Sequence, residues 1–476
     1  MKRLFAILLL AAALQTGLSA KVTLPSFFSD NMVLQQKQDV AVWGWTDKGR
    51  SVTIRPSWTR AKYTAAPDSG GKWMTRIPTP AAGGPYSISF SDGDKTTIGN
   101  VLIGEVWFCS GQSNMEMPVR GFHGQPVEGS AEVILGAKPS VPIRMCTIGK
   151  QYSPTPLESC TGAWEEHTPQ AVGDASAVAY FFARELYEVL GIPVGLLITD
   201  WGGTPIEAWM DEPTLREGFG SEFVFAHLEG GTSPEKYPNC SPCMLWNGQV
   251  APLVPFTFKG MLWYQGESNR DRAEQYTRLQ TAYVRMMRER FQNPGAPFYF
   301  VQIAPYDYSM DAPTLCGYFF EAQEKTLYLI PGSGMAGTLD VGQPHCIHPA
   351  KKREVGRRLA YMALADQYGV RGIEERSPRF KKAEFKNGEA VVSFTVGERG
   401  MAPLGEELEG FELAGADRVF KPATARVRGG TVVVRSPQVP EPVAVRYCFR
   451  NWCRGTLFNS YGIPALPFRS DDWPLN

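Results

Sequence analysis

The middle of the chain alternates short apolar runs with longer helix-like segments, and this alternation restricts the fold more than any other feature. Five apolar runs are each long enough for one buried strand: 101–109, 194–199, 260–264, 297–303 and 335–339. Four segments between or after them are helix candidates: 177–190, 272–291, 321–329 and 349–367. Repeated strand–helix units predict an α/β fold, with a mostly parallel sheet covered by helices on both faces.

The two flanks of the chain have a different pattern. Short alternating apolar runs, broken by Gly, Pro, Asp and Asn, occur before residue 100 and again from about residue 380. Such runs at short spacing are typical of β domains. We therefore expect an N-terminal β domain at 21–100, a central α/β domain at 101–370 and a C-terminal β domain at 380–476, with both flanks β-sandwich-like.

Residues 1–20 have the pattern of a secretory signal peptide. Lys2 and Arg3 precede an apolar stretch at 4–14, and a small residue, Ala20, ends the segment. About eleven apolar residues are too few to span a bilayer. We expect cleavage after Ala20 and a secreted or periplasmic protein without a membrane partner; a retained N-terminal anchor is the alternative.

Overall charge and cysteine content exclude several classes of function. The chain has 48 Lys and Arg against 48 Asp and Glu, so bulk charge does not favour nucleic-acid binding. Of nine cysteines, Cys240 with Cys243 and Cys448 with Cys453 are candidate disulfide pairs after export. We expect no cofactor and no metal, because the one CxxC has no second copy and the HxxH at 345–348 lacks the glutamate of a helical HExxH motif.

Four polar, glycine-containing loops follow predicted strands, at 110–116, 200–207, 265–270 and 340–348. In an open α/β sheet, functional groups gather at the carboxyl edge of the strands. These loops are therefore expected to converge on one rim, which is the predicted site.

A serine and a histidine on this rim suggest nucleophilic chemistry, since a serine hydroxyl needs a base to take its proton. Ser113 lies in the loop at 110–116. Of the five histidines, only His345 and His348 directly follow a predicted strand onto the rim. The residues alone leave a non-catalytic loop serine and a metal-binding histidine pair open.

Several motifs closely resemble those of the sialate O-acetylesterase family, within the SGNH hydrolase superfamily. Four ordered segments carry the likeness: WFCSGQSNME at 107–116, GGTPIEAW at 202–209, WYQGESN at 263–269 and IHP at 347–349. It extends to FSDNMVLQ at 28–35, to WGW at 43–45 and to NSYGIPALPF at 459–468. The resemblance covers nearly the whole mature chain and implies an SGNH-hydrolase-like parallel sheet.

The resemblance implies acyl transfer to water, with Ser113 as nucleophile and His348 rather than His345 as base. SGNH enzymes commonly place an aspartate three residues before the histidine, and related esterases place one two residues before it. Here these positions hold His345 and Cys346. Asp340, on the same loop, is the predicted triad carboxylate; a Ser–His dyad oriented by a backbone carbonyl is the alternative.

The resemblance also implies an oxyanion hole, the set of donors that binds the negative oxygen of the tetrahedral intermediate. We expect the backbone N–H groups of Ser113 and Gly203 and the side-chain amide of Gln265 to form it. Gly202 is an alternative backbone donor and Asn269 a competing amide.

The expected partner is an acetylated sugar. Arginine matches the carboxylate of sialic acid, so Arg120 and Arg270, which flank the loops, are candidate ligands, and Trp209 or Trp201 would stack on a sugar ring. The sequence predicts a serine esterase, a carboxylic ester hydrolase that removes O-acetyl groups from sialic acids. An acetylxylan or other acetyl-sugar esterase, a metal-dependent deacetylase and a non-catalytic secreted carbohydrate-binding protein are the alternatives. The sequence contains no pattern that predicts the oligomeric state.

Overall fold

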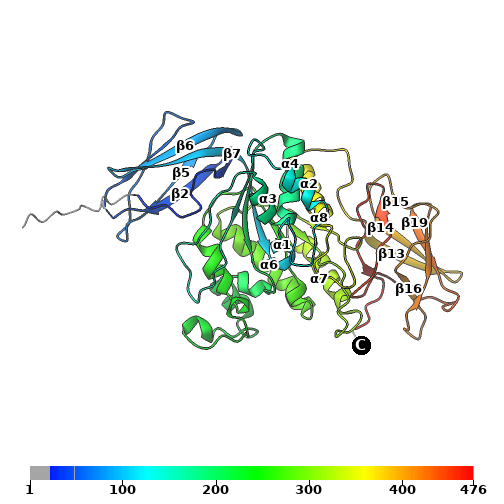
Figure 1. The fold of residues 1–476 in the computed structure, drawn as a ribbon. Coiled ribbons are helices and arrows are strands. Elements are labelled where there is room, and N and C mark those ends of the chain that lie inside the picture. The colour runs from blue at the N-terminus through cyan, green and yellow to red at the C-terminus, as the bar shows by residue number, and fades with distance from the viewer. Residues whose placement is uncertain (1–21, 48, 475–476) are drawn as a thin grey trace, which may run out of the picture.

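The computed structural model describes residues 22–47 and 49–474, arranged as three parts in a row (Figure 1). A β region drawn in blue and a β region drawn in orange and red lie at opposite ends of an α/β unit. The predicted signal peptide at 1–20 lies outside the described residues. In the described part of the chain, no helix is both long enough and apolar enough to cross a membrane.

The α/β unit is built on a parallel sheet. Its strands, in spatial order, are β8 (Ile143–Thr147), β9 (Val194–Asp200), β7 (Lys95–Gly111), β10 (Gly260–Tyr264), β11 (Phe298–Val301) and β12 (Ser333–Ala336). The predicted fold class is confirmed. Strand β8 was not predicted, because Arg144 interrupts its short apolar run.

Helices cover both faces of this sheet. Helix α4 (Ala177–Leu190) packs with α8 (Lys352–Tyr368) on one face, and α6 (Ala273–Arg290) packs with α7 (Leu315–Leu329) on the other. Alternate side chains of β7 point to opposite faces of the sheet. Trp107 and Cys109 pack in the core with α4 and α8, whereas Val106 and Phe108 pack in the core with α6 and α7. Three short helices complete the unit's periphery: α2 (Ser130–Leu135), α3 (Pro169–Asp174) and α5 (Glu212–Phe219).

Strand β7 runs through both regions and joins their strands into one continuous sheet. Its first half pairs antiparallel with β6 (Gly83–Ser91), and its second half runs parallel between β9 and β10. The domain boundary expected at residue 100 therefore falls inside one continuous strand. Within this strand Asn100 has a φ of +50°, a left-handed conformation that asparagine tolerates better than most residues. The other strands of this region are β1 (Val33–Gln35), β2 (Asp39–Trp45), β3 (Val52–Pro56), β4 (Tyr63–Ala65) and β5 (Lys72–Pro78).

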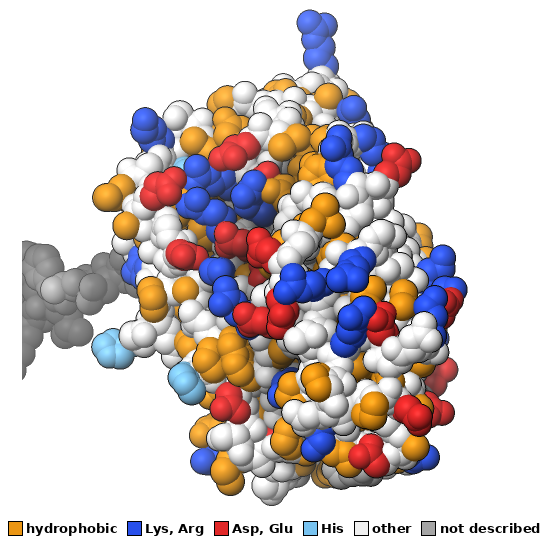
Figure 2. Space-filling view, turned by 90° about the vertical axis from the view of Figure 1, so that its right-hand side faces the viewer, with side chains coloured by type: hydrophobic (Ala, Val, Ile, Leu, Met, Phe, Trp, Pro, Cys, Tyr) orange, Lys and Arg blue, Asp and Glu red, His pale blue; other side chains and the backbone are white. Residues whose placement is uncertain are grey.

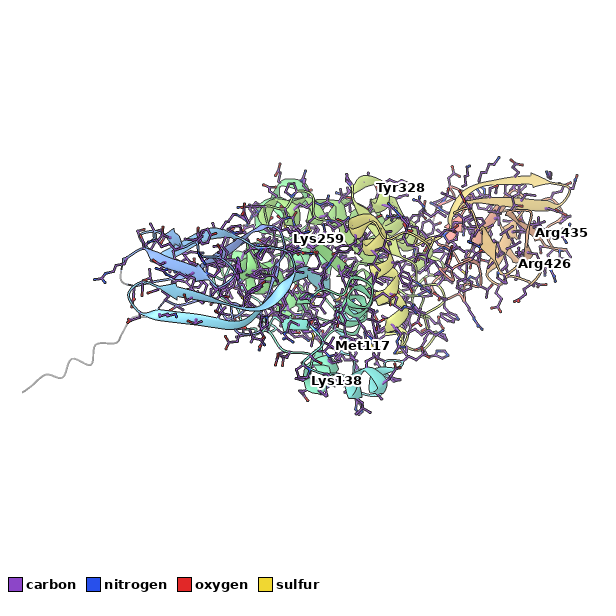
Figure 3. All side chains as sticks on the ribbon, turned by 90° about the horizontal axis from the view of Figure 1, so that it is seen from above. Met117, Lys138, Lys259, Tyr328, Arg426 and Arg435 are labelled. Atoms are coloured by element: carbon purple, nitrogen blue, oxygen red, sulfur yellow. The ribbon has the colours of Figure 1, made fainter. Side chains whose placement is uncertain are left out.

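The C-terminal region consists of antiparallel sheets. One sheet has the order β13 (Arg379–Lys386), β14 (Glu389–Thr395), β19 (Thr431–Arg435) and β18 (Thr424–Arg428). The second has the order β17 (Lys421–Pro422), β16 (Phe411–Ala414), β20 (Ala444–Tyr447) and β22 (Phe468–Arg469), and β15 (Met401–Ala402) pairs with β21 (Phe458–Asn459). Basic and acidic side chains are mixed over this end of the molecule (Figure 2). In Figure 3, Arg426 and Arg435 lie at this end, whereas Met117 lies near the middle of the long axis.

Two of the cysteines expected as pairs lie close together. The Sγ atoms of Cys448 and Cys453 are 2.7 Å apart, while the Sγ of Cys240 donates to the carbonyl of Gly203. With oxidised glutathione as oxidant, we expect Cys448 and Cys453 to form a disulfide, releasing reduced glutathione. Alkylation of the unfolded protein should then count two fewer thiols than after reduction, and Cys448→Ser should abolish this difference. A disulfide peptide joining Cys240 to Cys243 would contradict the prediction.

Candidate active site

The nucleophile candidate lies at a sharp turn after the central strand. Strand β7 ends at Gly111, and the one-turn helix α1 (Ser113–Glu116) begins two residues later. Gly111 has a φ of +149°, and a Cβ atom there would lie 2.1 Å from the carbonyl oxygen of Tyr264. Only glycine fits this position, and the turn leaves Ser113 half-buried at the carboxyl edge of the sheet.

Asn114 joins the serine loop to the histidine loop. Its Nδ2 donates to the carbonyl of Ile347 (3.1 Å) and to Oε1 of Glu267 (2.6 Å). Because Asn114 follows Ser113 and Ile347 precedes His348, this bond places the two predicted catalytic residues on adjoining segments. The loops at 110–116, 265–270 and 340–348 therefore meet, although they are far apart in the sequence.

The imidazole of His348 is held in the form that a general base requires. Its Nδ1 lies 2.7 Å from Oε1 of Gln125, and its ring packs edge-on against Phe122. Because the amide oxygen accepts a hydrogen bond, Nδ1 carries the proton and Nε2 keeps its lone pair. Burial lowers the pKa of His348 to about 4, and the nearby Lys352 ammonium contributes to this shift. The carboxylate of Glu116 acts in the opposite direction and raises the pKa. The ring is neutral at pH 7 and able to accept a proton.

Comparison with known proteins identifies the family of the chain. The family model described as "Carbohydrate esterase, sialic acid-specific acetylesterase" matches residues 103–365, more than half of the chain. The chain belongs to this family. The sialate O-acetylesterase of Homo sapiens is 27% identical over 405 residues, which cover 78% of this chain and 76% of that protein. That of Mus musculus is 26% identical, covering 97% of this chain and 96% of that protein.

A solved structure gives the same result for the fold. A carbohydrate acetylesterase from Xanthomonas citri is 36% identical, with a TM-score of 0.84, covering 95% of this chain and all of that one (100%). The chain is therefore a carboxylic ester hydrolase. Within residues 22–47 and 49–474, no group of three or more His, Cys, Asp or Glu side chains is arranged to hold a metal ion.

The expected role of Asp340 in this esterase requires correction. Both of its carboxylate oxygens accept from the guanidinium of Arg358, at 2.8 and 2.6 Å. Arg358 lies on α8 and is nearly fully buried, so Asp340 neutralises it. The residue found against Nδ1 of His348 is Gln125 instead. Gln125 lies in the loop between α1 and α2, which follows no strand, so the sequence carried no signal for it.

The two glycines of the loop at 200–207 differ in whether their backbone N–H groups are available to bind an oxyanion. The N–H of Gly202 donates to Oε2 of Glu116 (2.5 Å), whose other oxygen accepts from Lys150 (2.5 Å). Gly203 is exposed, has a φ of +74° and has open space where a side chain would lie. The N–H of Ser113, in the first turn of a helix, has no intrahelical acceptor. Ser113 and Gly203 thus remain the backbone candidates for the oxyanion hole, and Gly202 does not.

The expected oxyanion role of Gln265 is also corrected. Its side chain is fully buried, and its Nε2 lies within hydrogen-bonding distance of Oε1 of Gln112, the carbonyl of Thr204 and Oδ1 of Asn269. Asn269 in turn donates to Glu207. These amides connect the loops at 110–116, 200–207 and 265–270 and leave no N–H for a substrate oxygen.

Each of the three expected substrate ligands already has a partner within the protein. Trp209 is fully buried, with its indole N–H on Thr204, so it belongs to the core and its predicted role is corrected. Arg120 pairs with Asp174 at 2.6 Å. Arg270 pairs with Asp311 at 2.7 Å and stacks over the ring of Tyr308.

A different group of side chains lies beside the nucleophile. Trp201, half-buried, directly precedes Gly202, and a Cβ atom on Gly202 would lie 3.2 Å from the Cβ of Ser113. The ammonium of Lys150 lies 5.7 Å from the centre of the Trp201 ring, and the half-exposed ring of Tyr152 lies 6.2 Å from it. Sequence reasoning missed Lys150 and Tyr152, because they belong to a loop that follows the unpredicted strand β8.

Proposed function

We propose that this esterase removes O-acetyl groups from sialic acids, with Ser113 as the nucleophile and His348 as the general base. One observation carries the proposal. The hydrogen bond from Asn114 to the carbonyl of Ile347 joins the residue after the serine to the residue before the histidine. The neutral imidazole, with Nδ1 on Gln125, supplies the base that the hydroxyl needs.

The reaction follows the serine-hydrolase sequence of steps. The Oγ of Ser113 attacks the acetyl carbonyl carbon while Nε2 of His348 takes the hydroxyl proton. The N–H groups of Ser113 and Gly203 bind the oxyanion of the tetrahedral intermediate. The imidazolium then protonates the departing sugar oxygen, which leaves an acetyl-serine. Water, activated by His348, attacks this ester and releases acetate.

The cation beside the nucleophile supports an acidic sugar as substrate. The side chain of Lys150 is 41% exposed although one carboxylate already pairs with it, so its ammonium retains donors for a second anion. Trp201 and Tyr152 offer aromatic faces at the same place, which suits the C–H face of a pyranose ring.

The substrate proposal predicts a selective effect of Lys150→Gln. We expect kcat/KM for acetate release from O-acetylated sialic acid to fall about tenfold, the worth of one charge-assisted hydrogen bond. Acetate release from acetylated xylan, which has no carboxylate on its acetylated sugar, should change less than about twofold. The measurement is the initial rate of acetate release, with Ser113→Ala as the blank and Lys138→Gln, an exposed lysine, as the matched control.

Each other outcome excludes a specific part of the proposal. An equal loss on both substrates would mean that Lys150 acts through Glu116 and not on the sugar. Acetate release by the wild type from xylan alone would exclude sialic acid and leave an acetyl-sugar esterase. Wild-type protein that binds acetylated glycans without releasing acetate would exclude the esterase mechanism.

We also propose that the protein is exported, on the strength of the charged start and apolar stretch within residues 1–20. The N-terminal sequence of the protein recovered from the periplasm or medium should begin at Lys21.

A further inference from the structure

Lys352 is a fully buried lysine beside the catalytic residues. It is the first residue of α8, four residues after His348. Its Nζ donates to Oδ1 of Asn114 at 2.5 Å and lies 5.8 Å from the centre of the Tyr264 ring. A buried ammonium is costly unless it is paired, so its presence calls for a specific reason.

A buried carboxylate lies on the other side of the same asparagine. Glu267 is nearly fully buried, and its Oε1 accepts from Nδ2 of Asn114 at 2.6 Å, while Oε2 has no hydrogen-bond partner among the described residues. One amide thus separates an ammonium from a carboxylate. Buried ion pairs contribute little net stability, and their best-supported role is to specify one geometry.

The two charges determine which way the amide of Asn114 faces. An ammonium can only donate and a carboxylate can only accept, so Oδ1 must face Lys352 and Nδ2 must face Glu267. In this orientation, Nδ2 also reaches the carbonyl of Ile347. With the amide reversed, an oxygen would face that carbonyl and the bond between the two loops would be lost.

We propose that Lys352 and Glu267 are a positioning pair, which fixes the amide of Asn114 so that the serine and histidine loops stay joined, and that the ammonium of Lys352 acts on the imidazole of His348 as a nearby buried cation. This inference rests on the proposed function for its catalytic meaning. Neither side chain touches the reacting atoms.

The charges around His348 support the second part of the proposal. Burial is the largest cause of the lowered pKa of His348, the cation of Lys352 adds to it, and the anion of Glu116 opposes it. Behind Glu116 lie Lys150, which pairs with it, and buried Asp200, whose pKa burial and Glu116 raise to about 7.

The surroundings of Lys352 bring the pKa of its ammonium close to neutral pH. Burial lowers the pKa of Lys352 to about 7, and Glu267 and Cys346 oppose this shift. Burial likewise raises the pKa of Glu267, which the amide of Asn114 and the ammonium of Lys352 oppose. Each member therefore helps to keep the other charged.

The test is a titration of the His348 imidazole by NMR in the full-length protein, alongside the pH profile of kcat/KM on p-nitrophenyl acetate. In the Lys352→Met/Glu267→Gln double variant, which leaves no unpaired buried charge, we expect the pKa of His348 to rise by on the order of one unit. The acid limb of the profile should move to higher pH by the same amount. We also expect kcat to fall about 10²-fold with little change in KM, because the loops are no longer joined.

Two further variants keep the test decisive. Glu116→Gln, which retains an acceptor for Gly202, should lower the pKa of His348, the opposite direction. Lys351→Met removes the same charge from the exposed neighbouring residue and should leave the pKa unchanged, because solvent screens that charge. An unchanged His348 titration in both the double variant and Glu116→Gln would overturn the proposal. Wild-type protein without esterase activity, but with the predicted imidazole shifts, would overturn the proposed function and uphold the electrostatic coupling.

Discussion

Ser113→Ala is expected to lower kcat/KM on p-nitrophenyl acetate by about 10³–10⁴-fold or more, since loss of the nucleophile leaves only the oxyanion donors and substrate binding. His348→Ala should cost a similar factor. Because the two residues act as one unit, the double variant should be little worse than either single variant. The free energy of unfolding of Ser113→Ala should change by no more than about 0.5 kcal/mol, because the side chain is small and half-exposed.

Ser268→Ala is the matched control for this prediction. Ser268 is also half-buried, in the neighbouring loop at 265–270, so the same hydroxyl is removed a short way from the nucleophile. It should retain wild-type kcat/KM. Rates of ester hydrolysis and urea unfolding curves provide both measurements. A Ser113→Ala protein that keeps more than a tenth of the wild-type rate would show that another group attacks the ester.

Strands buried on both faces were the easiest elements to predict. Strand β10 was expected at 260–264 and β9 at 194–199, and the structure has Gly260–Tyr264 and Val194–Asp200. Every residue of both strands is buried, which is why each appears in the sequence as an apolar run, although β9 ends in the polar residues Thr199 and Asp200. Helix α4 agrees at both ends, because Ser176 caps its start and Gly191, with a φ of +66°, ends it.

Contacts between distant loops could not be predicted in the same way. The convergence of loops on one sheet edge followed from strand direction alone, and Ser113 and His348 were proposed from it together with the family resemblance. Which side chain lies against His348 depends instead on the path of the loop containing Gln125, a path that no local pattern specifies. The orientation of the Asn114 amide likewise depends on two charges more than 150 residues away, Glu267 and Lys352.

The different partners of Asp340 and Gln125 predict that these two residues affect different properties. Asp340→Asn is expected to lower the free energy of unfolding by about 2–3 kcal/mol, because Arg358, with a side chain only 5% exposed, loses its counter-ion. Partial exposure of Asp340 keeps the loss below the full cost of a buried pair. Its kcat should stay within about threefold of wild type, since its oxygens face Arg358 and not His348.

Gln125→Leu should show the reverse, with kcat lowered about 10–100-fold and stability nearly unchanged, because the half-buried loop loses only the bond that orients the imidazole. Gln125→Glu would place a carboxylate against Nδ1 and so raise the pKa of His348, because a nearby anion favours the protonated ring. The acid limb of its pH–rate profile should therefore move to higher pH, while its kcat at alkaline pH should approach that of the wild type. A large loss of kcat in Asp340→Asn without loss of stability would reverse this assignment and restore an Asp–His–Ser triad.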